Sequence, residues 1–159
     1  MRWVAPVGPF DLNAASRRTD TPRWVASILD SRATWLLARL ALTLPYWWSG
    51  IDKVTHPQVA LTEVAGLLGT NQPLPIYLLL MIVQLGGSLL VILNRWAWLG
   101  AGALGVFTLI VTILVHAFWN LDGPGRFAEM NTFLEHLALI AGFVFAAMMA
   151  RHNPKNPIR

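Results

Sequence analysis

The sequence of 159 residues contains no cysteine. Disulfide bonds, cysteine-ligated metal sites, cysteine-ligated iron–sulfur clusters and cysteine nucleophiles are therefore excluded. The motifs of phosphate loops, dinucleotide-binding turns, serine hydrolases and zinc proteases are absent as well. Because the chain has no motif for an electron-carrying cofactor of its own, we expect no covalently bound cofactor and no independent catalysis.

Charged side chains are also scarce. They make up 13% of the residues, against about 25% in a typical soluble domain. Hydrophobic residues make up 55%, and the mean hydropathy is +0.52. So few charges cannot cover a soluble surface, which argues against a soluble enzyme, a disordered tail and a nucleic-acid partner. The pI of about 10.4 is typical of a membrane protein with basic cytoplasmic segments.

Four apolar segments approach the roughly 20 residues that a membrane-spanning helix requires. They cover residues 33–51, 74–93, 96–118 and 130–150. A fifth segment, residues 57–68, begins with proline and is followed by Gly69, which predicts a helix too short to span. We therefore predict an all-α integral membrane four-helix bundle with a short interfacial helix between spans 1 and 2.

Lysine and arginine are distributed unequally between the two predicted sides of the membrane. If the N-terminus is cytoplasmic, nine of them lie on that side and two on the other. The positive-inside rule then places both termini in the cytoplasm of a multi-pass bacterial inner membrane protein. We expect a cytoplasmic arm at residues 1–30, a four-span domain at residues 31–150 and a basic cytoplasmic tail at residues 151–159. Within the arm, Thr21 and Pro22 predict a short helix that ends near Asp30.

Two polar residues lie well inside the predicted spans. Arg39 is roughly 9 Å deep at 1.5 Å per residue, and Gln84 lies near the middle of the second span. We expect both to face the bundle interior, where Arg39 reaches Gln84 in an intramembrane polar contact. The alternative is that Arg39 extends to the inner headgroups. Small residues at positions 86–88, 100, 102 and 105 predict that helices approach closely there.

A second set of polar residues gathers at the predicted outer ends of the spans. Such groups can contact a quinone or handle its protons, bind a metal, or join helices by hydrogen bonds. No HxxxH or ExxH pair supports a metal site, so we assign no metal ligand. Glu135 and His136 are adjacent and point about 100° apart, so we expect His116 to approach one of them. No catalytic residue is assigned, and the quinone or proton-handling candidates are His116, Glu135, His136, Asp52 and Lys53.

Three segments resemble the DoxX family of small membrane proteins. Arg39 with Gly50-Ile51-Asp52-Lys53 resembles the family's arginine in the first span and the Gly-x-x-Lys at its end. Residues 84–90 (QLGGSLL), followed by Asn94-Arg95, resemble its second span and basic turn. Residues 133–142 (FLEHLALIAG) resemble its phenylalanine-led fourth span. The resemblance covers about residues 35–150, although Gln84 stands where the family often has an acid, and Glu135-His136 where a Lys-Asn-like pair is common.

The resemblance implies a four-helix membrane protein associated with redox chemistry, because the family takes its name from subunits linked to thiosulfate:quinone oxidation. We favour an accessory subunit of a larger respiratory or photosynthetic membrane complex, with quinone contact as the most concrete mechanism. One alternative is a quinone-linked oxidoreductase subunit with its own site among the outer polar residues. A third interpretation is a small transporter, which an acidic residue inside a span permits.

Overall fold

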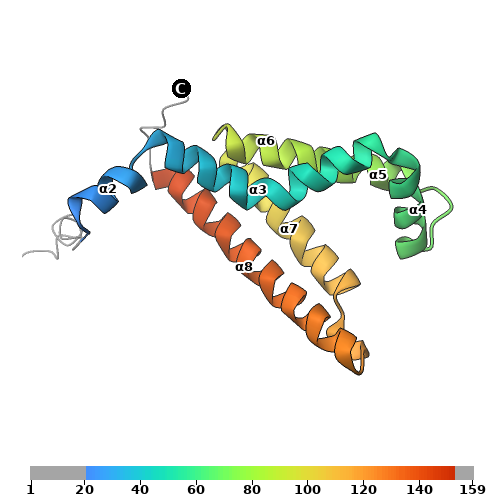
Figure 1. The fold of residues 1–159 in the computed structure, drawn as a ribbon. Helices are drawn as coiled ribbons and strands as arrows, with labels where there is room; N and C mark the ends of the chain where they lie inside the picture. The colour runs from blue at the N-terminus through green and yellow to red at the C-terminus, as the bar shows by residue number, and fades with distance from the viewer. Residues whose placement is uncertain (1–20, 153–159) are drawn as a thin grey trace, which may run out of the picture.

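The computed structural model describes residues 21–152. Every regular element in this range is a helix, as predicted (Figure 1). Most of the predicted N-terminal arm, residues 1–20, and most of the basic tail, residues 153–159, lie outside the described residues. The described part of the arm contains α2 (Arg23–Leu29), which follows Pro22 and ends at Asp30. The short helix predicted at that position is therefore confirmed.

α3 (Arg32–Thr55) begins at a cap, because the Ser31 hydroxyl accepts a hydrogen bond from the Thr34 amide at 3.1 Å. It is followed directly by α4 (Pro57–Leu68), whose first residue is the proline that the start of a helix favours. α4 ends at Gly69, where φ is 58°, a left-handed conformation that glycine adopts without a steric penalty. The helix predicted at residues 57–68 is confirmed at both ends.

The second predicted span consists of three consecutive helical segments. They are α5 (Leu74–Met81), the π-helical segment η1 (Ile82–Gly86) and α6 (Gly87–Ile92). A π turn inserts one extra residue into a helix and shifts the faces of the residues that follow. Gln84 lies in the middle of η1 and is only 5% exposed. The sequence predicts this span but not its π turn.

α7 (Ala97–Val115) and α8 (Pro124–His152) form an antiparallel pair (Figure 1). The connection between them, called the α7–α8 turn below, contains the short 3-10 helix η2 (Phe118–Asn120). Asn94 and Trp96, each with φ of 53°, turn the chain from α6 into α7. Tight turns at both ends of α7 therefore hold it beside α6 and α8.

Among residues 21–152, three helical segments are long and apolar enough to cross a membrane. They are Leu74–Ile92, Ala97–Asn120 and Pro124–Arg151, with mean hydropathies of 2.1, 2.2 and 1.9. They correspond to the second, third and fourth predicted spans. α3 has 24 residues but is not among them, because Arg39 and Pro45 lower its hydropathy. The described residues therefore form an all-helical membrane protein with three candidate spans, and the predicted four-helix bundle is not confirmed.

α6 and α7 approach each other closely at two glycines. A Cβ on Gly100 would lie 2.6 Å from the Gly87 carbonyl oxygen and 2.8 Å from Leu90 Cβ. A Cβ on Gly87 would lie 3.0 Å from Leu104 Cγ. By contrast, a Cβ on Gly102 would meet nothing within 4 Å. Packing through small residues is thus confirmed at Gly87 and Gly100 but not at Gly102.

The long helices share one apolar core. α7 packs against both α6 and α8, and α3 packs against η1 and α6. In Figure 1 the α3 and α5–α6 pair meets the α7–α8 pair near the start of α7, and the two pairs diverge toward α4 and the α7–α8 turn. The core cluster contains Tyr46, Val91, Ala101, Leu104 and Phe143.

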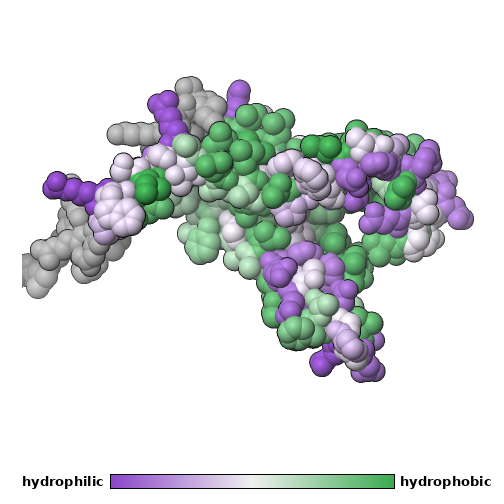
Figure 2. Space-filling model, viewed as in Figure 1, coloured by the Kyte–Doolittle hydropathy of each residue, from purple (hydrophilic) through white to green (hydrophobic). Residues whose placement is uncertain are grey.

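The surface of the helices is largely apolar. Figure 2 shows hydrophobic residues over the middle of the molecule and hydrophilic residues near α4 and near the α7–α8 turn. Within the chain, 6% of the most apolar stretch of α8 is buried, against 33% for Leu74–Ile92 and 28% for Ala97–Asn120. An apolar surface of this extent is consistent with a lipid bilayer environment.

Candidate functional site

Three polar side chains, two threonines and one histidine, lie in a row along one face of α7. Thr108, Thr112 and His116 are four residues apart, so their side chains lie above one another on the helix. Thr108 Oγ1 donates to the Leu104 carbonyl oxygen at 2.6 Å, and Thr112 Oγ1 donates to the Thr108 carbonyl oxygen at 2.6 Å. Both threonines are buried, with exposures of 3% and 0%. Their hydroxyl oxygens are thus held in place to accept hydrogen bonds from neighbouring helices.

Each of these threonines is paired with a residue of another helix. The Tyr46 hydroxyl, from α3, lies 2.5 Å from Thr108 Oγ1. The His136 Nδ1, from α8, lies 2.8 Å from Thr112 Oγ1. α7 is therefore tied to α3 near the core and to α8 one turn closer to the α7–α8 turn.

His116, Glu129 and His136 form the candidate site, which we call the histidine cluster. His116 ends α7, and its Nδ1 lies 2.6 Å from Glu129 Oε2 of α8. The rings of His116 and His136 meet edge to face, with their centroids 4.9 Å apart. His116 is 18% exposed and Glu129 is 37% exposed, so the cluster is half-buried between the two helices. It combines two imidazoles and a carboxylate, which can accept, donate and exchange protons.

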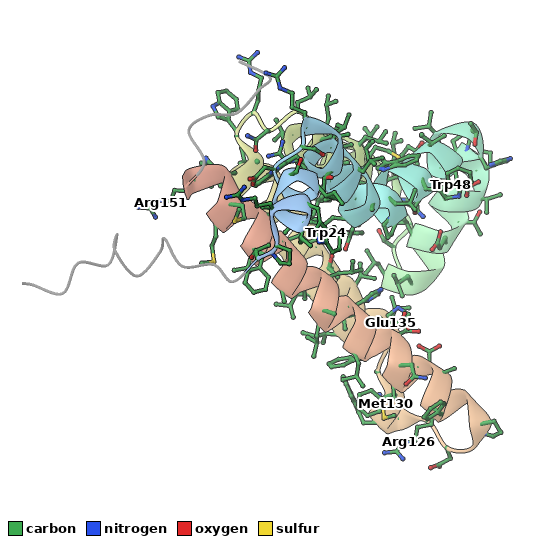
Figure 3. The ribbon with its side chains drawn as sticks, turned by 60° about the vertical axis from the view of Figure 1, so that its left-hand side comes forward. Trp24, Trp48, Arg126, Met130, Glu135 and Arg151 are labelled. Atoms are coloured by element: carbon green, nitrogen blue, oxygen red, sulfur yellow. The ribbon has the colours of Figure 1, made fainter. Side chains whose placement is uncertain are left out.

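The approach of His116 to one residue of the Glu135-His136 pair is confirmed, and that residue is His136. Glu135 is exposed and forms no hydrogen bond or ion pair with the histidine cluster among the described residues. Figure 3 shows it between Arg126 and Arg151, which lie near the two ends of α8. The carboxylate of the cluster comes from Glu129, which the sequence interpretation did not select. Glu129 precedes His136 by seven residues, two helical turns, so this spacing is the signal that places both on one face.

Aromatic side chains surround the α7–α8 turn. Phe118, Trp119 and Phe133 contact one another edge to face, with centroid distances of 5.3, 5.4 and 5.9 Å. Phe133 lies one turn before His136 on α8, and Phe118 lies two residues after His116. These two phenylalanine rings therefore belong to residues within three positions of a cluster histidine, and such rings suit a flat headgroup.

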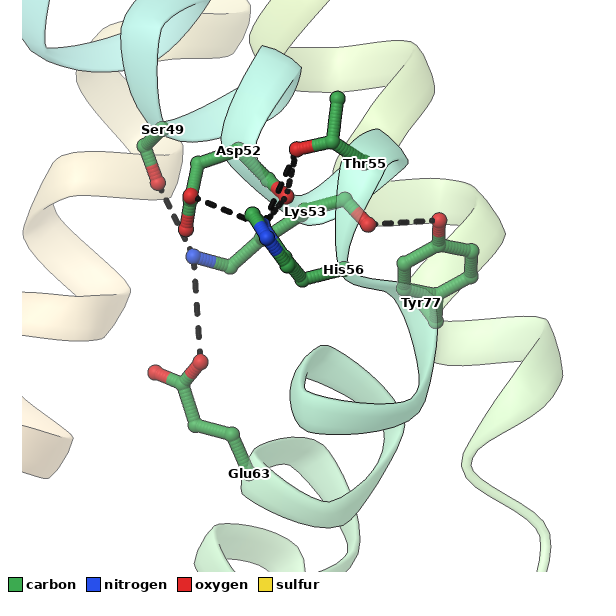
Figure 4. A network of polar contacts seen from close by, with 7 residues as sticks. All are labelled: Ser49, Asp52, Lys53, Thr55, His56, Glu63 and Tyr77. Carbon is green, nitrogen blue, oxygen red and sulfur yellow. Dashed lines mark hydrogen bonds and ion pairs between the residues drawn. The ribbon is translucent and has the colours of Figure 1, made fainter.

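Asp52 and Lys53 lie in a separate network at the end of α3 (Figure 4). Lys53 Nζ donates to Ser49 Oγ at 2.9 Å and lies 3.8 Å from a Glu63 carboxylate oxygen. The Tyr77 hydroxyl donates to the Lys53 carbonyl oxygen at 3.2 Å. These contacts tie α4 and α5 to the end of α3.

His56 completes this second network. Its Nδ1 lies 3.2 Å from Asp52 Oδ1 and 3.0 Å from the Thr55 hydroxyl. Between residues 21 and 152, no hydrogen bond or ion pair joins this network to the histidine cluster. The structure thus separates the predicted candidates: His116 and His136 meet in the histidine cluster, whereas Asp52 and Lys53 belong to the second network.

Arg39 and Gln84 do not form the predicted contact. The Arg39 guanidinium lies over the ring of Trp35, 5.5 Å from its centroid, in a cation–π arrangement. Gln84 Oε1 is buried and has no hydrogen-bond partner among the described residues. The Ser88 hydroxyl donates to the Gln84 backbone carbonyl at 2.6 Å and leaves the amide side chain unaffected. Arg39 therefore packs on its own helix, whereas Gln84 lies beside Gly50 near the other end of α3, where a Cβ on Gly50 would be 3.6 Å from Gln84 Cβ.

The described residues hold no group of three or more His, Asp or Glu side chains that could bind a metal ion.

The sequence model of the DoxX family matches residues 34–117, more than half of the chain. This chain belongs to the DoxX family. No curated protein and no solved structure matches it.

The matched part of the family runs from the start of α3 to the end of α7. It includes Thr108, Thr112 and His116 but stops before α8. Glu129 and His136, the α8 half of the histidine cluster, lie outside the matched residues. The phenylalanine-led segment at residues 133–142 is likewise outside the family match.

Proposed function

We propose that this DoxX-family chain is an accessory subunit of a redox membrane complex, and that it contacts a quinone headgroup at the histidine cluster. The observation that carries the proposal is the edge-to-face pair of imidazoles from the end of α7 and from α8, whose centroids lie 4.9 Å apart. The inner-membrane location, the subunit role and the quinone are all parts of the proposal.

The position of the cluster suits a molecule with an apolar tail and a polar headgroup. The cluster joins the end of α7 to the first half of α8, and both helices are apolar enough to span a bilayer. A quinone tail stays in the hydrocarbon, while the headgroup oxygens seek hydrogen bonds near the interface. An imidazole that is protonated on both nitrogens can donate to such an oxygen, and the carboxylate of Glu129 can balance the charge of a protonated His116.

An accessory role follows from what the chain itself can supply. It has no cysteine and no recognisable motif for an electron carrier, so the redox centre of the complex would belong to a partner subunit. The largely unburied α8 provides surface for such a partner as well as for lipid. The chain would thus position the quinone and handle its protons while the partner transfers the electrons.

The proposal includes four spans with both termini in the cytoplasm. α3 has 24 residues and is about 36 Å long at 1.5 Å per residue, which is enough to cross a hydrocarbon core of about 30 Å. Its low hydropathy is tolerable because Arg39 is shielded by Trp35. With four spans, the nine-to-two distribution of basic residues places the α7–α8 turn on the outer side.

Quinone content of the native assembly tests the proposal. The complex is purified in mild detergent from cells that carry the parent chain, His116→Ala or His56→Ala, and the bound quinone is extracted and quantified. His56 is the matched control, because it is an exposed histidine of the second network. We expect His116→Ala to lose quinone while the complex remains assembled, and His56→Ala to retain it. Equal quinone content in all three assemblies would leave the histidine cluster as a purely structural link between α7 and α8.

A further inference from the structure

The hydrogen bonds of Thr112 determine where His136 carries its proton. The Thr112 hydroxyl has one hydrogen, and a carbonyl oxygen can only accept. At 2.6 Å from the Thr108 carbonyl oxygen, Thr112 Oγ1 must donate to it. The remaining contact, 2.8 Å to His136 Nδ1, then requires that the ring donates and that Thr112 Oγ1 accepts. Neutral His136 therefore has its hydrogen on Nδ1 and a lone pair on Nε2.

The same reasoning applies to the neighbouring groups. Thr108 donates to the Leu104 carbonyl oxygen, so the Tyr46 hydroxyl must donate to Thr108. An ionised carboxylate only accepts, so His116 donates from Nδ1 to Glu129. Neutral His116 thus also has a lone pair on Nε2. Neither Nε2 has a hydrogen-bond partner among the described residues.

We propose that Thr112 is a positioning residue that holds His136 with its hydrogen on Nδ1, so that the histidine cluster binds hydroquinone in preference to quinone. This inference rests on the proposed function. While both imidazoles are neutral, a hydroquinone hydroxyl can donate to a free Nε2 lone pair, whereas a quinone oxygen is only an acceptor and meets no donor there. One hydrogen bond of this kind contributes about 1 kcal/mol, so the preference should be about five- to tenfold.

Thr112 is suited to this task because it is fully buried, with no exposed surface. Water therefore does not compete for its hydroxyl oxygen, and His136 has one partner at Nδ1. Valine has nearly the same shape as threonine but no hydroxyl, whereas serine keeps the hydroxyl. Thr112→Val and Thr112→Ser are consequently a matched pair that separates the hydrogen bond from the packing.

The first measurement is the nitrogen NMR spectrum of ¹⁵N-histidine in the full chain, reconstituted in lipid nanodiscs at pH 8.5, where imidazole is neutral. Nitrogen shifts distinguish a ring protonated at Nδ1 from one protonated at Nε2. We expect His136 to be protonated at Nδ1 in the parent chain and in Thr112→Ser, and to become a mixture of both forms in Thr112→Val. A parent chain with His136 protonated at Nε2, or an unchanged spectrum in Thr112→Val, overturns the inference.

The second measurement is the binding of a short-tailed benzoquinone and of its hydroquinone to the same nanodiscs, without oxygen and at the same pH. The parent chain should bind the hydroquinone about five- to tenfold more tightly, and Thr112→Val should show a smaller preference, because His136 but not His116 loses its fixed Nε2 lone pair. Equal affinity of the parent for both forms overturns the inference but leaves the quinone contact intact. If neither form binds, the proposed quinone contact fails, and the preference fails with it.

Discussion

Replacing Gly100 with alanine should force α6 and α7 apart. The added methyl group would lie 2.6 Å from the Gly87 carbonyl oxygen, and no change of rotamer relieves this contact because the oxygen belongs to the backbone. Overpacking a close-packed interior costs about 1–3 kcal/mol, and replacing a helical glycine with alanine recovers roughly 0.5–1 kcal/mol. The expected net loss in the free energy of unfolding is at most about 2.5 kcal/mol, and Gly100→Ala should be about 1–3 kcal/mol less stable than a variant that gains the same methyl group without the contact.

Gly102→Ala is the matched control for this prediction. It makes the same chemical change two residues away on α7, where the added methyl group would meet nothing within 4 Å. It should leave the free energy of unfolding unchanged or raise it by up to about 1 kcal/mol. Reversible unfolding of the parent and both variants in one type of bicelle measures the difference. If Gly100→Ala is as stable as Gly102→Ala, then α6 and α7 do not approach each other as closely as described.

Three further predictions concern single contacts and the topology. Tyr46→Phe keeps the buried ring but removes the hydrogen bond to Thr108, so it should lower the stability measured by thermal melting in detergent by about 0.6–1.5 kcal/mol. Unchanged melting would contradict this hydrogen bond. Glu63→Gln should change stability by less than about 0.5 kcal/mol in the same assay, because its carboxylate is 62% exposed and 3.8 Å from the Lys53 ammonium; a larger loss would show that this ion pair holds α4 in place. The chain has no native cysteine, so single cysteines report topology directly, and an impermeant thiol reagent applied to whole spheroplasts should label position 71 but neither position 16 nor position 156.

Hydropathy and helix-end signals predicted most of the fold. The segments at residues 74–93, 96–118 and 130–150 match three long helices, because each is a continuous apolar run. The bounds of α4 were predictable as well, since a proline at its start and a glycine after its end act locally. The π turn around Gln84 was not, because a single inserted residue leaves the apolar run unchanged.

The candidate site was predictable only in part. The antiparallel pairing of the third and fourth spans was enough to bring His116 to His136. The choice of Glu129 over Glu135 depends on which face of α8 contacts α7. The sequence does not indicate that face, because apolar residues occur on all sides of α8. Arg39 was expected at Gln84 from depth alone, but depth does not fix the direction of a side chain that can stack on Trp35 of its own helix.

Photolabelling tests the central claim most directly. Membranes that contain the native complex are irradiated with a photoreactive quinone, with or without an excess of the parent quinone, and the labelled peptides of this chain are mapped. Label should concentrate between residues 116 and 136, around the histidine cluster, and the excess quinone should suppress it. Label spread evenly over the apolar helices, or unaffected by the excess quinone, would contradict a quinone site at the histidine cluster.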